Sequence, residues 1–358
     1  MKTILHIVGN RPQFVKLAVL HKELATAGII NQKIIHTGQH DSEIMSGIFF
    51  KQLGIPLPNI ILQPAKNIPA DSFISATSIA LQQYFAQNKD CIVLVYGDTN
   101  TTLAASLAAT KIGLPLLHFE GGIRTGDNTM PEEINRIITD RLSAVNYCCT
   151  SKNQTQLIKE GYGKAINSKV ILSGDLMYDA FLQIKPLEKN IIPEKEYIAC
   201  TIHRAANILS KSNLQNIISG LSNIHKKIPV VMAVHPHTKK RMEEFGLLPS
   251  FTMLPPLAYQ EMKTLLLHST YVITDSGGAA REAYFCAKKS IVVMEKPFWP
   301  EIIEKQCSFS SIAESTILYQ NFEKLPSLPS DFSSPIFGTG NAAASIKNHL
   351  IDYLEIIS

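Results

Sequence analysis

The sequence lacks the features that mark a membrane or secreted protein. No apolar run approaches the ~20 residues that a membrane-spanning helix needs. The N-terminus, MKTILHIVGNRP, carries a single lysine and a brief apolar run that ends at Gly9. This pattern predicts a first β-strand instead of a signal peptide. We therefore expect no membrane among the partners of this chain.

Excess charge and cysteine motifs are missing as well. The chain has 34 basic and 30 acidic residues, so its net charge is only +4, and the basic residues are scattered along it. Nucleic-acid-binding proteins gather such residues on one face, so nucleic acid is not an expected partner. The six cysteines show no CxxC spacing, and most lie in apolar runs such as CIVLVYG. Reduced core cysteines of this kind indicate a cytoplasmic protein.

What the sequence does contain is an alternation of short apolar runs with longer helical patterns. The expected strands of a first series are TILHIV, KIIHT, CIVLVY, PLLHF and VNYCC, and its expected helices span 11–27, 41–53, 70–87, 99–112 and 131–143. A second series has the strands EYIACTI, PVVMAV, FTMLP, TYVIT and SIVVM. Apolar strands that alternate with helices form parallel sheets covered on both faces. The sequence therefore predicts an α/β protein with two doubly wound domains.

The domain limits follow from composition. The stretch KPLEKNIIPEK, residues 185–195, is rich in proline and charge and separates the two series. We expect an N-terminal domain over 1–185, a C-terminal domain over 186–340 and a last helix within 341–358. That helix follows the loop SSPIFGTGN and could cover either domain. In doubly wound sheets ligands bind at the carboxyl ends of the strands, so we expect the site there, in a cleft between the domains.

Two motifs of the first domain lie at such strand ends. VGNRPQFVK places Arg11 and Lys16 near a helix N-terminus, which favours anions, although an ordinary strand–helix loop would have the same pattern. YGDTNTT places Asp98 at the end of a buried strand. The structural alternative makes Asp98 the N-cap of the next helix.

The stretch HFEGGIRTGDNTMPEEINR, residues 118–136, gathers carboxylates and arginines around a Gly-Gly pair. Glu120 ends a strand, and the two glycines allow a sharp turn. Glu132 and Glu133 stand in the first turn of a helix, where the helix dipole favours an acidic residue by ~0.3–1 kcal/mol. The dipole does not explain Glu120 and Asp98 at neighbouring strand ends. We therefore expect Asp98, Glu120 and Glu132 around one substrate.

The second domain carries anion-binding signals. TDSGGAAREA opens a helix with Ser276, Gly277 and Gly278, whose backbone N–H groups suit a phosphate, and Glu282 one turn later suits a ribose. CTIHRAAN places His203 and Arg204 at the end of another strand. VHPHTKK holds His235 and His237, but no third ligand follows at metal-like spacing, so we expect no metal site. Carboxylates in one domain and an anion cradle in the other suit a nucleotide-sugar.

These motifs make the chain similar to the UDP-N-acetylglucosamine 2-epimerase family, and to its non-hydrolysing branch in particular. The matching stretches occur in one order over nearly the whole chain: VGNRPQFVK, TGQH, VYGDTNTTLAASLAA, HFEGGIRTGDNTMPEEINR, GDLMYDA, TIHRA, TDSGGAAREA and WPE. The resemblance implies the GT-B fold, two facing Rossmann-like domains with an interdomain cleft. It also implies an isomerase without an external cofactor, acting on a UDP-sugar as a homodimer.

The resemblance also implies roles for individual residues. The catalytic set is Asp98, Glu120, Glu132 and His203, and the UDP-sugar contacts are Arg11, Lys16, Arg124, Arg136, Arg204, His235, Ser276, Gly277, Gly278 and Glu282. The implied reaction inverts C2 of the sugar by eliminating UDP and adding it back to a 2-acetamidoglucal. Departures from the family pattern are Ala206-Asn207, the shortened stretch MEKPFWPE, and DSEIM after TGQH, where many members hold a second, activating UDP-sugar site.

Other functions share parts of this pattern. A hydrolysing epimerase would release N-acetylmannosamine and UDP. A GT-B glycosyltransferase would share the fold and the nucleotide site but would need an acceptor. A non-catalytic nucleotide-sugar binder would fit the altered MEKPFWPE loop, although the presence of Asp98, Glu120, Glu132 and His203 argues against it.

Overall fold

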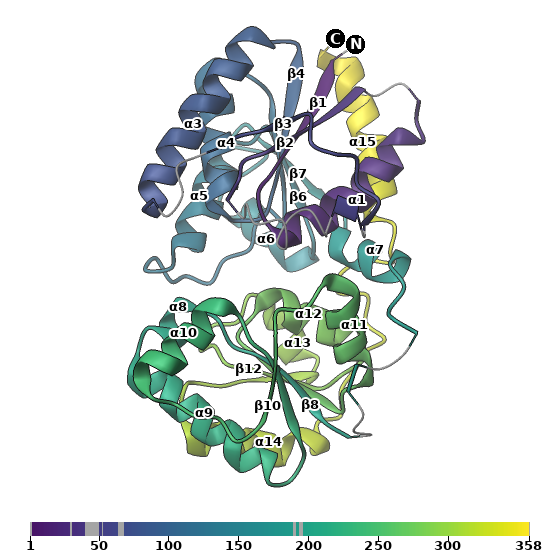
Figure 1. The fold of residues 1–358 in the computed structure, drawn as a ribbon. Coiled ribbons are helices and arrows are strands. Elements are labelled where there is room, and N and C mark those ends of the chain that lie inside the picture. The colour runs from purple at the N-terminus through teal and green to yellow at the C-terminus, as the bar shows by residue number, and fades with distance from the viewer. Residues whose placement is uncertain are drawn as a thin grey trace. The chain divides into compact units, whose positions relative to one another are not determined.

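A computed structural model describes residues 2–28, 31–39, 50–51, 53–63, 68–188, 191–192 and 196–357. Most of the expected helix over 41–53, together with His40 and the DSEIM stretch, lies outside these residues. Contacts within the chain divide it into two compact units (Figure 1). Unit 1 comprises Met1–Gln183 and Pro335–Ser358, and unit 2 comprises Ile184–Ser334.

Unit 1 is built on a parallel sheet. Over its described residues the strand order is β3-β2-β1-β4-β5-β6-β7, and every pair is parallel. The strands are β1 (Thr3–Val8), β2 (Asn31–His36), β3 (Ile60–Ile61), β4 (Cys91–Tyr96), β5 (Leu116–Phe119), β6 (Val145–Cys148) and β7 (Lys169–Leu172). The helices are α1 (Arg11–Ala25), α3 (Ala70–Gln87), α4 (Asn100–Ile112), α5 (Pro131–Leu142), α6 (Ser151–Lys159), α7 (Leu176–Gln183) and α15 (Ala342–Ile357).

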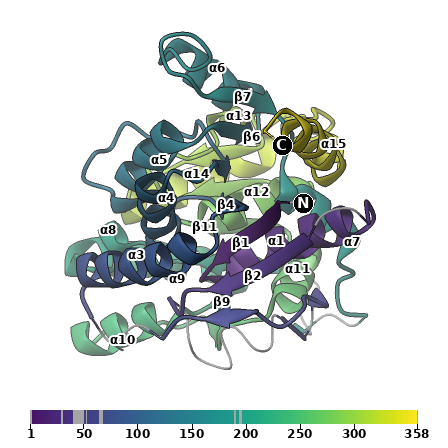
Figure 2. The same ribbon diagram turned by 90° about the horizontal axis from the view of Figure 1, so that it is seen from above.

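Helices cover both faces of this sheet, as the unalternating apolar strands predicted. Helices α3, α4 and α5 lie on one side of it and α1, α7 and α15 on the other (Figure 2). Small residues of α4, such as Ala105 and Ala109, pack with Leu81 and Phe85 of α3 over Val93 and Val95 of β4. These apolar side chains exclude water from the face of the central strands that α3 and α4 cover.

The last helix, α15, belongs to unit 1 although the chain reaches it from unit 2. Buried Asp179 of α7 accepts hydrogen bonds from the N–H groups of Ala342 (3.1 Å) and Ala343 (2.7 Å). A carboxylate at this position satisfies N–H groups that have no partner inside the helix. Lys347 of α15 also forms an ion pair with Glu23 of α1. These contacts hold α15 against α1 and α7.

Unit 2 repeats the architecture with a parallel sheet of order β10-β9-β8-β11-β12-β13. Its strands are β8 (Ile198–Thr201), β9 (Val230–Ala233), β10 (Thr252–Leu254), β11 (Tyr271–Thr274), β12 (Ser290–Val292) and β13 (Ser308–Ser310). Its helices are α8 (Ala205–Ile208), α9 (Lys211–His225), α10 (Pro236–Phe245), α11 (Tyr259–His268), α12 (Gly277–Phe285), α13 (Pro300–Glu304), α14 (Ser315–Lys324) and the 3₁₀-helix η1 (Leu325–Ser327). The prediction of two doubly wound, Rossmann-like domains is confirmed, although the short strands β3, β7 and β13 were not among the expected strands.

Both sheets reverse their winding direction at one point. In unit 1 this switch point lies between β1 and β4, and in unit 2 it lies between β8 and β11. Ligands of open α/β sheets bind beyond the carboxyl ends of the strands at such points. The loops that follow β1, β4, β8 and β11 are therefore the expected ligand-binding loops. Among the described residues, no helix combines the length and apolar character that a membrane span requires.

Candidate functional site

At the switch point of unit 1, hydrogen bonds join the loop after β1 to β4. The Gln13 amide of α1 donates to the carbonyl of Tyr96 (2.9 Å) and to the hydroxyl of Thr102 (3.1 Å). Asn10 caps α1, so Arg11 is the first residue of that helix, where the sequence predicted it. Arg11 is only partly exposed.

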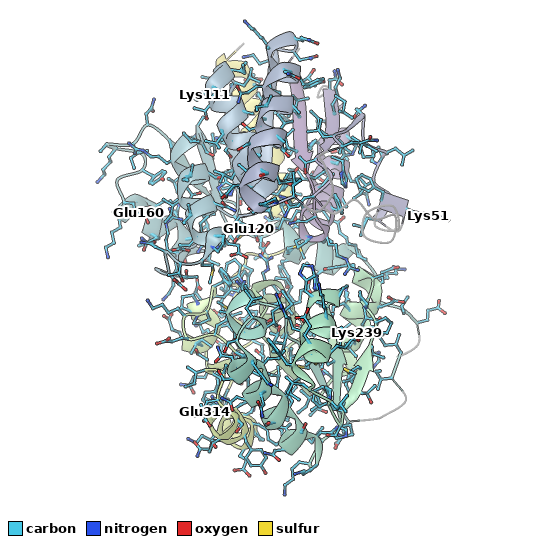
Figure 3. All side chains as sticks on the ribbon, turned by 60° about the vertical axis from the view of Figure 1, so that its left-hand side comes forward. Lys51, Lys111, Glu120, Glu160, Lys239 and Glu314 are labelled. Carbon is cyan, nitrogen blue, oxygen red and sulfur yellow. The ribbon has the colours of Figure 1, made fainter. Side chains whose placement is uncertain are left out.

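Glu120 leaves β5 in a strained conformation. Its φ of +73° lies in the left-handed region that non-glycine residues rarely adopt, and such strain clusters at functional sites. The Glu120 carboxylate forms an ion pair with the ammonium of Lys16 from α1, and their side chains are only 11% and 4% exposed. A Cβ added to Gly97 would lie 2.8 Å from Glu120 Oε2, so only glycine leaves room for this carboxylate. Figure 3 labels Glu120 at the lower edge of unit 1.

Asp98, which follows β4, pairs with an arginine instead of capping a helix. Thr99 is the N-cap of α4, where its hydroxyl accepts the N–H of Thr102, so the alternative that made Asp98 the cap is wrong. The Asp98 carboxylate contacts the guanidinium of Arg136, which is almost fully buried in α5. The structure therefore brings together two of the predicted site residues, Asp98 and Arg136.

Glu133, which the sequence assigned only to the helix dipole, organises the loop before α5. Its carboxylate accepts the N–H groups of Thr125 (2.9 Å) and Gly126 (2.9 Å) and binds Arg136 (2.5 Å). Burial by itself would raise the pKa of Glu133, but these hydrogen bonds and the Arg136 charge hold it below its ordinary value. Glu133 thus fixes both the loop and the guanidinium that faces Asp98.

Glu132, one residue earlier, has a different environment. It is partly exposed in the first turn of α5, after Pro131. No hydrogen bond or ion pair ties its carboxylate to the described residues of the chain. The structure therefore leaves Glu132 available for a ligand but does not show it beside Asp98 or Glu120.

A second buried network of hydrogen bonds and ion pairs involves His118 of β5. The ring of His118 lies between the Asp140 carboxylate (Nδ1 to Oδ1, 2.7 Å) and the Gly97 carbonyl (Nε2 to O, 2.8 Å). Asp140 also accepts the guanidinium of Arg124 (2.7 Å), which in turn binds Glu160 on the surface (Figure 3). Burial alone would raise the pKa of Asp140, but His118 and Arg124 lower it. Carboxylates on both sides hold the predicted substrate contact Arg124 in place within unit 1.

At the switch point of unit 2, the buried Asp275 holds the loop after β8. Its carboxylate accepts the N–H groups of His203 (3.0 Å) and Arg204 (2.9 Å) and the side-chain amide of Asn207 (3.0 Å). The Arg204 guanidinium donates to the Asp275 carbonyl (2.6 Å). His203 Nδ1 lies 3.7 Å from Asp275 Oδ1, and the histidine side chain is 39% exposed. The predicted pair His203 and Arg204 is thus fixed beside the loop that starts α12.

The N-terminus of α12 has the predicted form. The Ser276 hydroxyl caps the helix by accepting the N–H of Ala279 (3.3 Å), and Gly277 and Gly278 form its first turn. A Cβ added to Gly277 would collide with the ring of Phe298 (2.7 Å). A Cβ added to Gly278 would only contact the Ser276 hydroxyl, at 3.6 Å. The MEKPFWPE loop therefore packs on Gly277, and the N–H groups of the first turn remain a suitable phosphate cradle.

Other predicted contacts of unit 2 lie around this turn. His235 is the N-cap of α10, and its ring centroid lies 5.9 Å from that of His203. The Arg204 guanidinium stacks over the ring of Phe298 at 4.3 Å. Glu282, one turn into α12, is 8% exposed. Within unit 2 the fold therefore gathers His203, Arg204, His235 and the start of α12.

Five buried carboxylates with clear contacts were not predicted as site residues from the sequence. They are Glu133, Asp140, Asp175, Asp179 and Asp275. Asp275 could have been found, because it directly follows β11 just as Asp98 follows β4. Asp140 and Asp179 bind groups that are distant in the sequence, such as His118 and Ala343, and no local pattern indicates such partners.

Comparison with known proteins identifies relatives over nearly the whole chain. The family model described as UDP-N-acetylglucosamine 2-epimerase matches residues 22–351. The UDP-2,3-diacetamido-2,3-dideoxy-D-glucuronate 2-epimerase of Pseudomonas aeruginosa is 34% identical, over 97% of this chain and 99% of the relative. A UDP-N-acetylglucosamine 2-epimerase homolog of Methanococcus maripaludis is 35% identical, over 96% of this chain and 98% of the relative.

Solved structures agree. The UDP-GlcNAc 2-epimerase of Methanocaldococcus jannaschii, solved in complex with UDP-GlcNAc and UDP, has a TM-score of 0.89 and 30% identity, covering 98% of this chain and 99% of its own. The UDP-GlcNAc 2-epimerase of Neisseria meningitidis, bound to UDP-GlcNAc, has a TM-score of 0.87 and 26% identity, covering 98% and 100%. The expected GT-B type of fold is confirmed by these similarities.

Proposed function

This chain belongs to the UDP-N-acetylglucosamine 2-epimerase family and is an epimerase, and we propose that it interconverts UDP-GlcNAc and UDP-ManNAc, or a closely related UDP-2-acetamido sugar, without net hydrolysis. The observation that carries this proposal is the pair of carboxylates at the ends of β4 and β5. Asp98 and Glu120 each contact a buried cation of unit 1, Arg136 and Lys16. A cation beside a carboxylate favours its ionised form, which a base requires.

The proposed reaction has two steps with a 2-acetamidoglucal between them. In the first step a base removes the C2 proton, the C1–O bond to UDP breaks with both electrons on the diphosphate, and a C1=C2 double bond forms. In the second step C2 receives a proton on the opposite face while UDP adds back to C1. Departure of the diphosphate builds positive charge at C1, and this charge makes the C2 proton easier to remove.

Unit 1 supplies the acid and base groups in this scheme. Glu120 and Asp98 act on the two faces of the sugar, and Glu132 assists as a partly exposed carboxyl group without an ion-pair partner among the described residues. Strain at Glu120 and its ion pair with Lys16 hold that carboxylate in one orientation. Positioned acid–base groups accelerate such steps by about 10²–10⁴-fold.

Unit 2 supplies the nucleotide site in this scheme. The N-terminal turn of α12 and Arg204 stabilise the diphosphate as it departs, Glu282 binds the ribose, and His203 acts near the scissile bond. Arg11 and Lys16 provide further positive charge from unit 1. We further propose that the protein acts as a cytoplasmic homodimer.

The test follows the C2 hydrogen by proton NMR in D₂O. With UDP-GlcNAc, deuterium should replace the C2 proton as UDP-ManNAc appears, and the exchange should survive dialysis against EDTA. Glu120→Gln and Asp98→Asn should each slow the exchange by at least about 10²-fold. Asp127→Asn is the matched control, because Asp127 lies in the loop between β5 and α5 and its carboxylate accepts the N–H (3.0 Å) and the hydroxyl (2.6 Å) of Thr129.

Each other outcome identifies a different function. Irreversible release of deuterated N-acetylmannosamine and UDP would establish a hydrolysing epimerase. Transfer to an added acceptor without C2 exchange would establish a glycosyltransferase. The substrate panel includes a UDP-2,3-diacetamido uronate, because the relative from Pseudomonas aeruginosa is named for that sugar. Protium retained at C2 of a true epimerised product would refute elimination and re-addition.

A further inference from the structure

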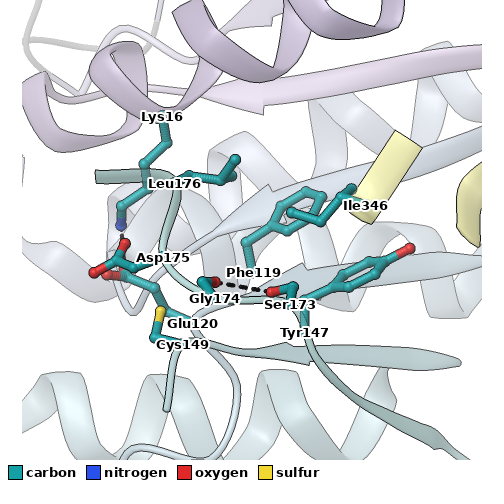
Figure 4. Close-up of a pocket in the computed structure, with 10 residues that line it drawn as sticks. All are labelled: Lys16, Phe119, Glu120, Tyr147, Cys149, Ser173, Gly174, Asp175, Leu176 and Ile346. Carbon is teal, nitrogen blue, oxygen red and sulfur yellow. Dashed lines mark hydrogen bonds and ion pairs between the residues drawn. The ribbon is translucent and has the colours of Figure 1, made fainter. Parts of the chain in front are cut away.

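Behind Glu120, unit 1 contains a small pocket that the proposed reaction does not explain. Figure 4 shows its lining residues, which come from α1, the ends of β5, β6 and β7, and α15: Lys16, Phe119, Glu120, Tyr147, Cys149, Ser173, Gly174, Asp175, Leu176 and Ile346. Its free volume is about 10 Å³, which is the room that a single water needs. The pocket is therefore too small for a sugar. Glu120 forms part of its wall, so the other lining groups are neighbours of the Glu120 side chain.

Two carboxylates share this pocket. A carboxylate oxygen of Glu120, one of Asp175 and the sulfur of Cys149 all lie within 4.8 Å of one another. Asp175 is 1% exposed, so little water screens its charge. The ammonium of Lys16 forms its ion pair with Glu120 in the same place (Figure 4). Two carboxylates and one ammonium would leave a net negative charge in a nearly dry site, and two neighbouring carboxylates resist simultaneous ionisation.

Asp175 is held firmly in this position. It precedes α7, and its Oδ1 accepts the N–H of Met177 (2.8 Å). Its own N–H donates to the carbonyl of Phe337 (3.0 Å), in the segment that leads to α15. The motif GDLMYDA therefore places a carboxylate at the start of α7 and directs it toward the end of β5. A helix cap alone would be served equally well by asparagine or serine.

Among the described residues that line the pocket, four besides Glu120 carry charged or titratable groups: Lys16, Tyr147, Cys149 and Asp175. Lys16 faces Glu120 from α1, Asp175 from the loop after β7, and Cys149 from the loop after β6. Tyr147 of β6 also lines the pocket, but its hydroxyl is bound to His349 of α15 (2.8 Å). Asp98, the residue after Gly97, forms an ion pair with Arg136. Among these groups, Lys16 and Asp175 have opposite effects on the charge of Glu120.

We propose that Asp175 is a positioning residue for Glu120 that makes the two carboxyl groups titrate as a coupled pair. Lys16 favours the ionised form of Glu120, which takes a proton. Asp175 favours the protonated form, which returns one. The opposing groups hold Glu120 where gain and loss of a proton are both easy, as an epimerase that works in both directions requires. This inference rests on the proposed function, in which Glu120 exchanges a proton with C2.

The test substitutes Asp175→Asn, which keeps an oxygen for the N–H of Met177 and removes only the charge. The pH–rate profile of C2 exchange should then move to lower pH by about one unit, because Glu120 loses its proton more readily without a neighbouring carboxylate. Lys16→Met should move the same limb to higher pH. The control is Asp179→Asn, a buried carboxylate of the same helix that binds α15 and does not line the pocket. Its profile should not move.

A second measurement does not need substrate. Infrared difference spectra of the unliganded protein, recorded between about pH 4 and pH 8, detect protonated carboxyl groups. The wild type should contain a carboxyl band that titrates at higher pH than the corresponding band of Asp175→Asn. Because burial also raises the pKa of Asp179, both spectra are recorded in the Asp179→Asn background, from which that second carboxyl group is absent. Identical spectra and profiles for wild type and Asp175→Asn would overturn the proposal and leave Asp175 a helix cap. Absence of C2 exchange in the wild type would refute the proposed function instead, while the infrared result would still decide the coupling.

Discussion

Replacing Glu133 by glutamine tests whether buried ionic contacts hold the loop that carries the acid–base groups. Glu133 and Arg136 are each 1% exposed, and the carboxylate accepts two backbone N–H groups besides the guanidinium. Glutamine keeps one oxygen for Thr125 and Gly126, but it turns an NH₂ group or a neutral oxygen toward Arg136. The buried guanidinium then keeps only one of its two carboxylate partners, Asp98.

The structure sets the size of the effect. Removing one partner of a buried ion pair costs about 3–5 kcal/mol. We expect Glu133→Gln to lower the free energy of unfolding by that amount, a large fraction of the typical ~5–15 kcal/mol. Glu160→Gln is the matched control, because Glu160 also binds an arginine but its side chain is 29% exposed. Exposed ion pairs contribute about 0–1 kcal/mol.

Urea denaturation followed by circular dichroism measures both variants. The effect of Glu133→Gln should also depend on pH. Because the folded pKa of Glu133 lies below its ordinary value of 4.5, its charge stabilises the fold above pH 4.5. This contribution is lost as the pH falls through the folded pKa, so the difference between wild type and variant should shrink below pH 4.5. A Glu133→Gln effect no larger than that of Glu160→Gln at neutral pH would refute the reasoning.

Two further predictions concern ligand binding and acid stability. UDP at 100 times its Kd should add about 2.7 kcal/mol to the free energy of unfolding. Glu282→Ala should weaken UDP binding in calorimetry, whereas Glu120→Gln, which alters only unit 1, should leave it nearly intact; equal binding by both variants would contradict the division of roles. Burial and the neighbouring His21 lower the pKa of His6 to about 3, so the unfolded chain binds this proton more readily and stability should fall below pH 6.5, by at most about 1.4 kcal/mol per pH unit. His6→Gln should flatten that part of the stability–pH curve in urea titrations, and an unchanged slope would show that His6 is not responsible.

The local sequence pattern was sufficient to predict most of the helices and strands and several helix caps. The helix expected over 70–87 is observed as α3 (Ala70–Gln87). A long amphipathic segment is the pattern from which a helix is predicted most readily. Pro131 begins α5 and Ser276 caps α12, as their side-chain chemistry predicts. The short strands β3, β7 and β13 escaped prediction because runs of two to four residues carry little periodic signal.

Position along the chain also located half of the candidate site. Asp98, Glu120, His203 and Ser276 all follow strands, and parallel strands point their carboxyl ends to one edge of a sheet. That rule needs only the order of the elements, so it works from the sequence. The motifs that contain these residues also identified the family.

Only the tertiary structure decided which charges meet. Lys16 and Glu120 are 104 residues apart, and nothing local to either one indicates the ion pair that joins them. The same holds for Asp175, which reaches Glu120 because β5, β6 and β7 are neighbours in the sheet. Strand order places these side chains together, and strand order depends on how the whole sheet buries its apolar faces. The sequence by itself therefore determined the elements and the kind of chemistry, while packing of the complete sheet determined which groups set the charge of each catalytic candidate.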